Sequence, residues 1–169
     1  MRIANAVLSE RLYRQCIQEL EMLLATNCWV SSTFVWQEKV TRGVNGNCIS
    51  TRVPPHLHKK IEKEIKHCLP TYSRISSCFY VWEKNSGISF HGDEKYLFDA
   101  TIYLNEDWNP DFGGGLVWEV EETKSTGIYH CFFPKKGAIA INERGSKHQV
   151  SIVSPNAPDS RKTIQIRGY

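Results

Sequence analysis

Apolar residues recur every three to four positions in two stretches of the first half of the chain. They are Leu8, Leu12, Cys16, Leu20 and Leu24 in the first stretch, and Leu57, Ile61, Ile65 and Leu69 in the second. This spacing places one apolar stripe along an α-helix. Pro54-Pro55 precedes the second stretch, where proline suits the start of a helix. The pattern therefore predicts two amphipathic helices.

From Ile75 onward the pattern changes to short β-branched and aromatic segments separated by turn residues. The predicted strands are Ser77–Trp82, Phe98–Leu104, Leu116–Val120, Gly127–Phe133, Ala138–Asn142, Gln149–Val153 and Thr163–Arg167. Many short strands separated by turn residues are typical of a β-sandwich or a jelly-roll barrel. We predict a mainly β fold in one domain over residues 1–169. Helical support from residues 1–73 is expected to pack outside a β core formed by residues 74–169.

The composition is that of an ordinary globular protein. Of the 169 residues, 41% are hydrophobic and 23% charged, and the net charge is +3. These values argue against disorder and make a nucleic-acid partner a weak candidate, because nucleic-acid binders usually carry a larger basic excess. No window approaches the roughly 20 apolar residues of a membrane helix. The first residues also lack the pattern of a signal peptide, so we expect a cytoplasmic protein.

The six cysteines form no C-x-x-C pair, which argues against a zinc knuckle or a thioredoxin motif. For a cytoplasmic protein, we expect reduced and mostly buried thiols.

One short motif has the spacing of metal ligands. In His91-Gly92-Asp93, residues i and i+2 of a strand would point an imidazole and a carboxylate to the same side. A third ligand must come from elsewhere, and His148 follows after several predicted strands. Two histidines and one carboxylate suit non-haem iron(II) and leave coordination positions open. The remaining histidines fit less well, since most lie in the second predicted helix without a carboxylate at metal spacing.

The last predicted strand alternates strictly. Arg161, Thr163, Gln165 and Arg167 share one face, and Lys162, Ile164 and Ile166 share the other. If the isoleucines pack outward, the polar face lines the barrel interior, where polar side chains are costly unless they bind something. An arginine with a hydroxyl two residues later is a suitable carboxylate clamp. The alternative is an exposed edge strand with solvated arginines.

The stretch from Ile75 to Tyr169 resembles the 2-oxoglutarate- and iron(II)-dependent oxygenases, specifically their prolyl-hydroxylase-like branch. The matching motifs are H-G-D at 91–93, Y-L-N-E-D-W-N-P-D-F-G-G-G at 103–115, P-K-K-G at 134–137, His148 followed by Gln149-Val150, and R-K-T at 161–163. The Y-L-N-E-D-W block that ends in glycines is the most specific of them. The resemblance implies a double-stranded β-helix core, also called a jelly roll.

The resemblance also implies roles for individual residues. His91, Asp93 and His148 match the iron(II) ligands. The residues that match the 2-oxoglutarate pocket are Arg161 for the distal carboxylate, Tyr103 as a hydrogen-bond donor, Thr163 beside the arginine, and a tyrosine for which Tyr80 is the candidate, with Trp82 as the alternative. The further cosubstrate would be dioxygen, with ascorbate as a candidate reductant.

The substrate is less defined. Related halogenases replace the carboxylate ligand by a small residue, so Asp93 favours hydroxylation, with a prolyl or other peptidyl or amino-acid substrate. The alternatives are a small-molecule oxygenase, a nucleic-acid demethylase of the AlkB type (suggested by the spacing of Arg161 and Arg167) and a non-catalytic metal-binding β-sandwich. No feature of the sequence indicates an oligomeric state.

Five residues are candidates for contact with the substrate. They are Trp36, Arg42, Arg52, Trp82 and Arg167. The stretch Trp36–Arg52 mixes aromatic and basic residues around an Asn45-Gly46 turn signal. It is either a lid that closes over the substrate or an ordinary hairpin at the edge of the main sheet.

Overall fold

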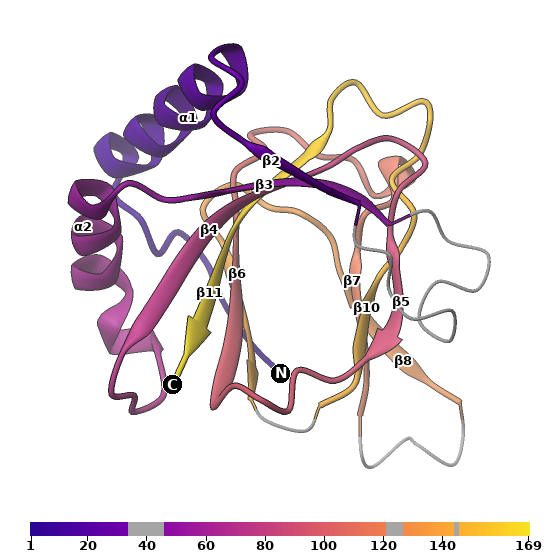
Figure 1. Cartoon of the computed structure of the whole chain (residues 1–169). Helices are drawn as coiled ribbons and strands as arrows, with labels where there is room; N and C mark the ends of the chain where they lie inside the picture. Colours follow the sequence, from indigo (N-terminus) through magenta and orange to yellow (C-terminus); the bar gives the residue numbers. More distant parts are fainter. Residues whose placement is uncertain (34–45, 121–126, 144–145) are drawn as a thin grey trace.

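The computed structural model describes residues 1–33, 46–120, 127–143 and 146–169. Within these, one antiparallel sheet has the order β1-β9-β6-β11-β4-β3-β2. Its strands are β1 (Arg2–Ala4), β2 (Val30–Thr33), β3 (Asn47–Arg52), β4 (Ile75–Trp82), β6 (Phe98–Tyr103), β9 (Ile139–Glu143) and β11 (Arg161–Gly168). A second antiparallel sheet has the order β5-β10-β7-β8, formed by β5 (Ile88–His91), β10 (His148–Val150), β7 (Leu116–Glu119) and β8 (Tyr129–Phe132). The two sheets face each other (Figure 1), which confirms the predicted double-sheet β fold.

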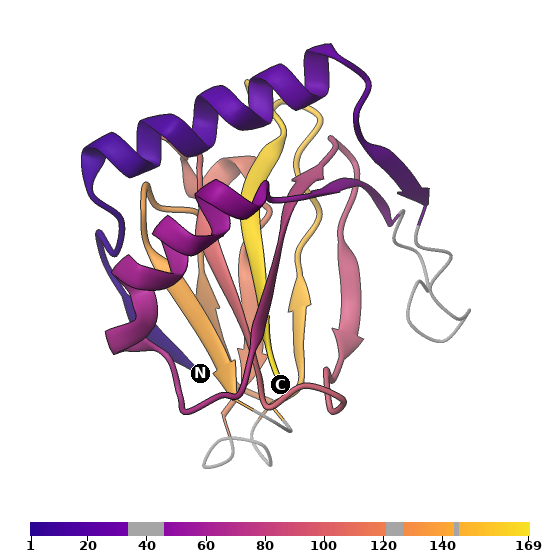
Figure 2. The same ribbon diagram turned by 60° about the vertical axis from the view of Figure 1, so that its left-hand side comes forward.

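Both predicted helices are present and lie on the outer face of the larger sheet (Figure 2). Helix α1 (Glu10–Ala25) begins after Ser9, whose side chain accepts a hydrogen bond from the Leu12 amide. Helix α2 (Pro55–Ile65) has proline in its first turn and continues into a short 3-10 helix, η1 (Lys66–Cys68). No helix among the described residues is both long enough and apolar enough to cross a membrane.

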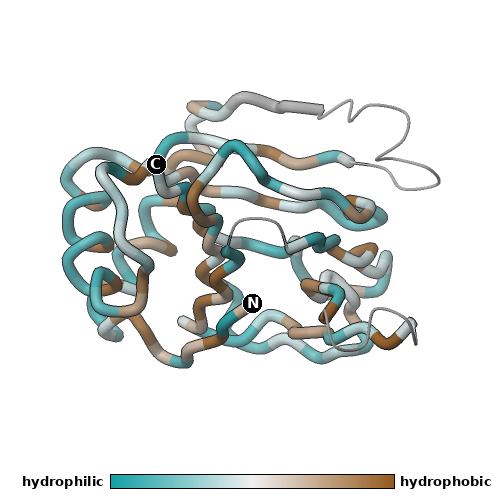
Figure 3. The backbone as a smooth tube through the Cα atoms, turned by 90° about the horizontal axis from the view of Figure 1, so that it is seen from below, coloured by the Kyte–Doolittle hydropathy of each residue, from teal (hydrophilic) through white to brown (hydrophobic). Residues whose placement is uncertain are grey.

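The strands of the larger sheet separate two apolar clusters. On β4, Phe79 and Val81 face the helices, and Tyr80 and Trp82 face the second sheet. On β11, Ile164 and Ile166 are fully buried among the residues of the helix side. Hydrophobic and hydrophilic stretches follow one another along the chain (Figure 3), and on β11 the isoleucines alternate with polar residues. The predicted outward packing of the isoleucines is therefore confirmed, and the polar face of β11 lies inside the barrel.

The structure also departs from the expectations. Strands β1, β2 and β5 were not predicted, because three or four residues are too few to establish an alternation. Asp93 lies beyond the end of β5, so the H-x-D motif spans a strand end. All six cysteines are free, but the expectation that most are buried is wrong: Cys28 and Cys131 are exposed, and only two of the six are buried.

The structure describes residues 46–52 of the Trp36–Arg52 stretch. Asn47–Arg52 forms β3, which pairs with β2 and β4 inside the larger sheet. This part is therefore scaffold. Residues 34–45, including Trp36 and Arg42, lie outside the described residues, and the lid hypothesis for them stays a prediction.

We expect Ile61→Ala to lower the free energy of unfolding by about 2–5 kcal/mol, the usual range for truncating a buried isoleucine. Ile61 is 1% exposed in the cluster between α2 and the larger sheet. Lys59→Ala, on the exposed side of the same helix, is the control and should change stability by less than about 0.5 kcal/mol. Urea denaturation followed by circular dichroism measures both. Equal effects of the two changes would contradict the assigned packing of α2.

Candidate active site

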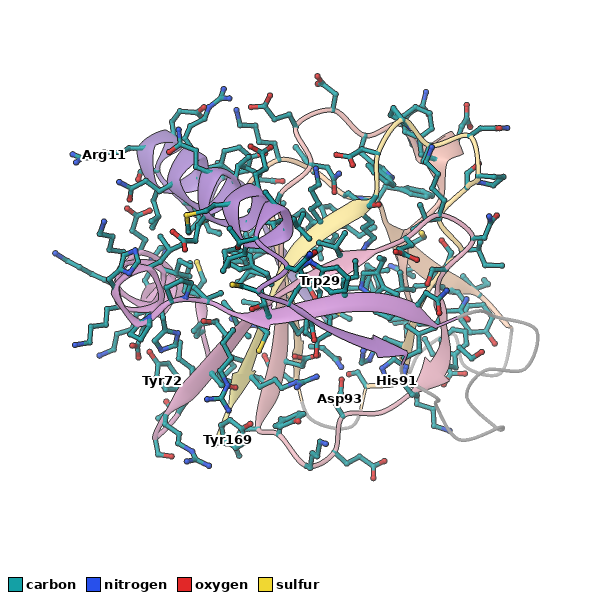
Figure 4. The ribbon with its side chains drawn as sticks, turned by 45° about the horizontal axis from the view of Figure 1, so that its top comes forward. Arg11, Trp29, Tyr72, His91, Asp93 and Tyr169 are labelled. Carbon is teal, nitrogen blue, oxygen red and sulfur yellow. The ribbon has the colours of Figure 1, made fainter. Side chains whose placement is uncertain are left out.

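Two strands of the smaller sheet bring the predicted metal ligands together. His148 at the start of β10 is the direct cross-strand partner of His91 at the end of β5. The two imidazole centroids lie 4.4 Å apart. Asp93 follows β5, and its Oδ2 lies 3.9 Å from His91 Nε2 and 3.6 Å from His148 Nε2. One ligand atom from each of the three residues lies within 4.8 Å of the other two. Figure 4 labels His91 and Asp93 in the region between the sheets.

Backbone carbonyl groups lie beside both histidines. His91 Nδ1 lies 2.8 Å from the carbonyl oxygen of Ser89, and His148 Nδ1 lies 3.2 Å from that of Ser146 and 2.9 Å from Asn142 Nδ2. A carbonyl oxygen can only accept, so Nδ1 of His91 carries the hydrogen and its Nε2 keeps a lone pair. Burial, followed by the neighbouring His91, lowers the pKa of His148 to about 4. A neutral imidazole with a free Nε2 is the form that binds a metal ion.

The triad opens onto a narrow cavity of about 50 Å³ between the sheets. Arg161 lines this cavity from the start of β11 and is only 2% exposed. Its Nε has no hydrogen-bond partner, and no carboxylate of the described residues lies within 4.0 Å of it. Burial lowers the pKa of Arg161. A buried cation without a counter-ion is costly, so the surroundings of Arg161 fit an anionic ligand.

Tyr103 adds a second unsatisfied group at the same place. The Arg161 guanidinium carbon lies 5.2 Å from the centroid of the Tyr103 ring. The Tyr103 hydroxyl is buried and has no hydrogen-bond partner among the described residues. Burial raises the pKa of Tyr103, so the hydroxyl keeps its proton and can donate it to an anion. The Arg161 guanidinium and the Tyr103 hydroxyl lie next to each other and interact, and a buried cation beside a phenol fits one carboxylate of a dicarboxylic cosubstrate such as 2-oxoglutarate.

The glycine run of the Y-L-N-E-D-W block makes room for Arg161. Gly113 and Gly114 both have φ of +66°, a region that favours glycine. A Cβ on Gly114 would lie 3.0 Å from Arg161 Cδ, and one on Gly113 would lie 2.0 Å from the Ile152 carbonyl oxygen. Gly114 therefore packs directly against the side chain of Arg161, and a side chain at Gly114 would displace it, whereas one at Gly113 would displace the backbone at Ile152.

Of the other predicted pocket residues, some line the cavity and others do not. Tyr80 and Trp82 both line the cavity, so the structure keeps both candidates for that position. Thr163 is fully buried and sits between Tyr80 and Tyr103 in the sheet, where its hydroxyl lies 3.5 Å from the Tyr80 carbonyl oxygen. Its hydroxyl is thus directed to the backbone of β4. Arg52 is exposed and does not line the cavity.

Sequence reasoning missed Asp99, which lines the cavity from β6. It accepts a hydrogen bond from Gln165 Nε2, and Gln165 Oε1 accepts one from the Thr101 hydroxyl at 3.0 Å. Burial, followed by the charge of Asp93, raises the pKa of Asp99 to about 8. Strand parity was the available signal, since Asp99, Thr101 and Tyr103 alternate along β6 and share the inner face.

Comparison with known proteins supports the fold. No protein-family model matches the chain, and no curated protein matches its sequence. Among solved structures, a prolyl-4-hydroxylase from Pseudomonas putida matches 99% of this chain and 91% of its own, with a TM-score of 0.74 and 17% identity. A prolyl hydroxylase from Trichoplax adhaerens, in complex with a peptide fragment of a hypoxia inducible factor, matches 99% of this chain and 82% of its own, with a TM-score of 0.75 and 15% identity.

A third solved structure is also similar. The non-haem, α-ketoglutarate-dependent carbocyclase SnoK from nogalamycin biosynthesis matches 98% of this chain and 77% of its own, with a TM-score of 0.69 and 14% identity. The chain therefore has the double-stranded β-helix fold of the 2-oxoglutarate and iron(II) oxygenases. It carries a two-histidine, one-carboxylate cluster inside that fold.

Asn142 holds the carbonyl that orients His148, since its Nδ2 lies 3.2 Å from Ser146 O and 2.9 Å from His148 Nδ1. We expect Asn142→Ala to weaken binding of a divalent metal by about 10–100-fold, as loss of such supporting contacts does. Isothermal titration with Mn²⁺ measures this. The neighbouring Glu143 is exposed, and Glu143→Ala should leave the affinity unchanged. An unchanged affinity in Asn142→Ala would show that Asn142 does not support His148.

Proposed function

We propose that the chain is an iron(II)- and 2-oxoglutarate-dependent dioxygenase that hydroxylates an unactivated C–H bond. The observation that carries this proposal is the pairing of two groups in one cavity. The cluster of His91, Asp93 and His148 offers three ligand atoms, and Arg161, which lines the same cavity, is buried without a counter-ion among the described residues. A facial triad with open positions suits non-haem iron(II), and an unpaired arginine suits the carboxylate of the cosubstrate.

Each residue has a definite task in this proposal. His91 and His148 bind the metal through Nε2, and Asp93 binds it through a carboxylate oxygen. Arg161 and the Tyr103 hydroxyl hold the distal carboxylate of 2-oxoglutarate and so fix its orientation toward the metal. When bound, iron(II) and 2-oxoglutarate supply the oxidising chemistry: one atom of dioxygen enters succinate as 2-oxoglutarate loses carbon dioxide, and the other enters the C–H bond.

The apolar residues that line the cavity keep water away from the site. Trp82, Ile88 and Val150 line the cavity and are at most 8% exposed, so they limit the access of water to the reacting atoms. The protein positions the substrate carbon and leaves the difficult step to the metal and the cosubstrate.

The substrate in this proposal is a prolyl or other peptidyl or amino-acid side chain. The prolyl hydroxylases of similar fold support this choice. A small-molecule substrate is the second candidate, supported by the similar fold of an enzyme from nogalamycin biosynthesis. Incubation with peptides, free amino acids and natural products, followed by mass spectrometry for a gain of one oxygen atom, separates these candidates.

We expect His91→Ala and Asp93→Ala to abolish both Mn²⁺ binding and the formation of succinate from 2-oxoglutarate. Two remaining ligands hold a divalent ion poorly because the third closes the coordination geometry. His56→Ala, an exposed histidine of α2, is the control and should keep both properties. Titration calorimetry measures the metal, and chromatography measures succinate. Full activity in either ligand variant would refute the metal assignment.

We expect Arg161→Met to weaken binding of 2-oxoglutarate to the Mn²⁺-loaded protein by about 2–5 kcal/mol, the usual cost of leaving one member of a buried charge pair alone. Lys162→Met is the control, because Lys162 points away from the cavity and pairs with Asp159 at 2.6 Å. Titration of 2-oxoglutarate under anaerobic conditions measures both. If Lys162→Met has the larger effect, the wrong residue of β11 has been assigned.

A further inference from the structure

The Y-L-N-E-D-W block contains a buried amide to which the proposed chemistry assigns no role. Asn105, just beyond the end of β6, is 6% exposed. Its Nδ2 donates a hydrogen bond to the Ser160 carbonyl oxygen at 2.9 Å, and its Oδ1 accepts one from the Lys162 amide, also at 2.9 Å. These two partners are the residues on either side of Arg161. Asn105 therefore holds the backbone from which the Arg161 side chain projects.

The chemistry of the two partners fixes the orientation of the Asn105 amide. A backbone carbonyl can only accept a hydrogen bond, and a backbone amide can only donate one. The NH2 group of Asn105 therefore faces Ser160, and its oxygen faces Lys162. An ionised aspartate or an apolar residue at this position would leave at least one of the two backbone groups without its partner, which is costly in a partly buried site.

The Asn105 side chain continues the ladder between β6 and β11 past the end of β6. The register of the two strands puts Tyr103 opposite Thr163. Continued by two residues, the same register puts Asn105 opposite Arg161. On its other side, Arg161 pairs with Trp82 of β4. The first residue of β11 is therefore held between the backbone of β4 and the side chain of Asn105.

A contact with helix α1 explains why a side chain replaces the backbone at this point. The Leu104 amide donates to the Lys162 carbonyl oxygen at 2.9 Å, as in a regular antiparallel pair. In such a pair the Leu104 carbonyl oxygen would accept from the Lys162 amide in return. Instead it accepts from the buried Tyr13 hydroxyl of α1 at 2.7 Å, and Asn105 Oδ1 takes its place. The block is thus anchored to α1 on one side and to β11 on the other.

The same block also contacts the side chain of Arg161. The guanidinium carbon lies 5.2 Å from the centroid of the Tyr103 ring, and Gly114 packs against Arg161 Cδ. These contacts limit the side chain, whereas Asn105 limits the backbone. Recognition of a carboxylate by arginine depends on the direction of its planar fork, so a shift of the backbone would turn the fork away from its ligand.

We propose that Asn105 is a positioning residue of the cosubstrate pocket: by holding the backbone on both sides of Arg161, it sets where the guanidinium meets the distal carboxylate of 2-oxoglutarate. This inference rests on the proposed dioxygenase function and adds a residue to it. Asn105 is not among the residues that line the cavity, and its amide is directed at the backbone of β11. Its effect on the cosubstrate therefore passes through Arg161.

The first test separates the cosubstrate from the metal. Asn105→Ala should raise the Kd of 2-oxoglutarate for the Mn²⁺-loaded protein by about 10–100-fold, because a displacement of about 1 Å weakens a positioned contact by up to this amount. The Kd of Mn²⁺ should change by less than about twofold, since Asn105 shares no partner with the metal ligands. Anaerobic titration calorimetry measures both. Asn105→Gln keeps the amide and should recover part of the loss.

The block offers a matched control at a second asparagine. Asn109 is exposed, and its side chain accepts a hydrogen bond from the Asp111 amide at 3.0 Å. Asn109→Ala also removes an asparagine that binds the backbone, but one that makes no contact with the residues flanking Arg161. It should leave the affinities for 2-oxoglutarate and Mn²⁺ unchanged.

A double-mutant cycle tests whether the effect passes through Arg161. In the Arg161→Met background, Asn105→Ala should change the Kd of 2-oxoglutarate by less than about twofold, because the group that it positions is already absent. 2-Oxobutyrate keeps the keto acid but lacks the distal carboxylate, so it should bind the unmodified protein and Asn105→Ala with equal affinity. A purely structural role would lower the affinity in both backgrounds and for both keto acids.

Hydrogen exchange examines the contact without any ligand. The Lys162 amide donates to Asn105 Oδ1, so this amide should exchange faster in Asn105→Ala than in the unmodified protein. Mass spectrometry of peptides that contain Lys162 measures the rate, which Asn109→Ala should leave unchanged. Equal rates in Asn105→Ala and the unmodified protein would mean that Asn105 does not hold this segment, and the inference would fail.

Three binding results would also overturn the inference. They are an unchanged affinity for 2-oxoglutarate in Asn105→Ala, a parallel loss of affinity for Mn²⁺, and an equal loss with and without Arg161. The proposed function fails differently. An unmodified protein that binds Mn²⁺ but not 2-oxoglutarate would refute the dioxygenase and this inference together. One that binds 2-oxoglutarate and forms succinate, with no effect of Asn105→Ala, would keep the dioxygenase function and lose only the role of Asn105.

Discussion

The structure depends on one strand that must satisfy two environments. Strand β11 lies in the middle of the larger sheet and pairs with β4 along its whole length and with β6 over most of it. One face of the strand presents isoleucines that pack against the helix layer. The other face presents two arginines and a glutamine to the cavity. The backbone hydrogen bonds on both sides and the buried isoleucines hold these charged groups away from bulk water, which a loop could not do.

The strict alternation of β11 also explains why its residues could be assigned from sequence. The period of two separates Arg161 from Lys162 without ambiguity, and the outward isoleucines decide which face is internal. The histidine and aspartate positions followed from ligand chemistry and order along the chain. These two kinds of signal, strand parity and donor type, account for the part of the fold and of the candidate site that could be predicted.

Other features depend on contacts between distant parts of the chain and left no local signal. Strand β5 has only four residues, and its place next to β10 is set by pairing with His148. Strand parity puts Asp99 on the inner face of β6, but its position opposite Arg167 depends on the pairing of β6 with β11. The orienting carbonyls of Ser89 and Ser146 are backbone groups, which a sequence does not distinguish. Each histidine is fixed by the carbonyl two residues before it, a relation visible only in the folded chain.

The position of β11 in the chain has a consequence for how the protein acquires its structure. This strand follows every other strand of the larger sheet in sequence, yet it lies between β4 and β6. Until β11 has been inserted, β4 and β6 lack the strand that pairs with both, and the cavity lacks the residues that β11 contributes to its lining. Contacts of such long sequence separation slow folding, because the entropy of closing a long loop is lost before the contacts form. During synthesis on the ribosome, α1 and α2 are therefore made before β11, the strand that completes the sheet against which their apolar faces pack. This interval is the stage at which the chain most needs protection from aggregation.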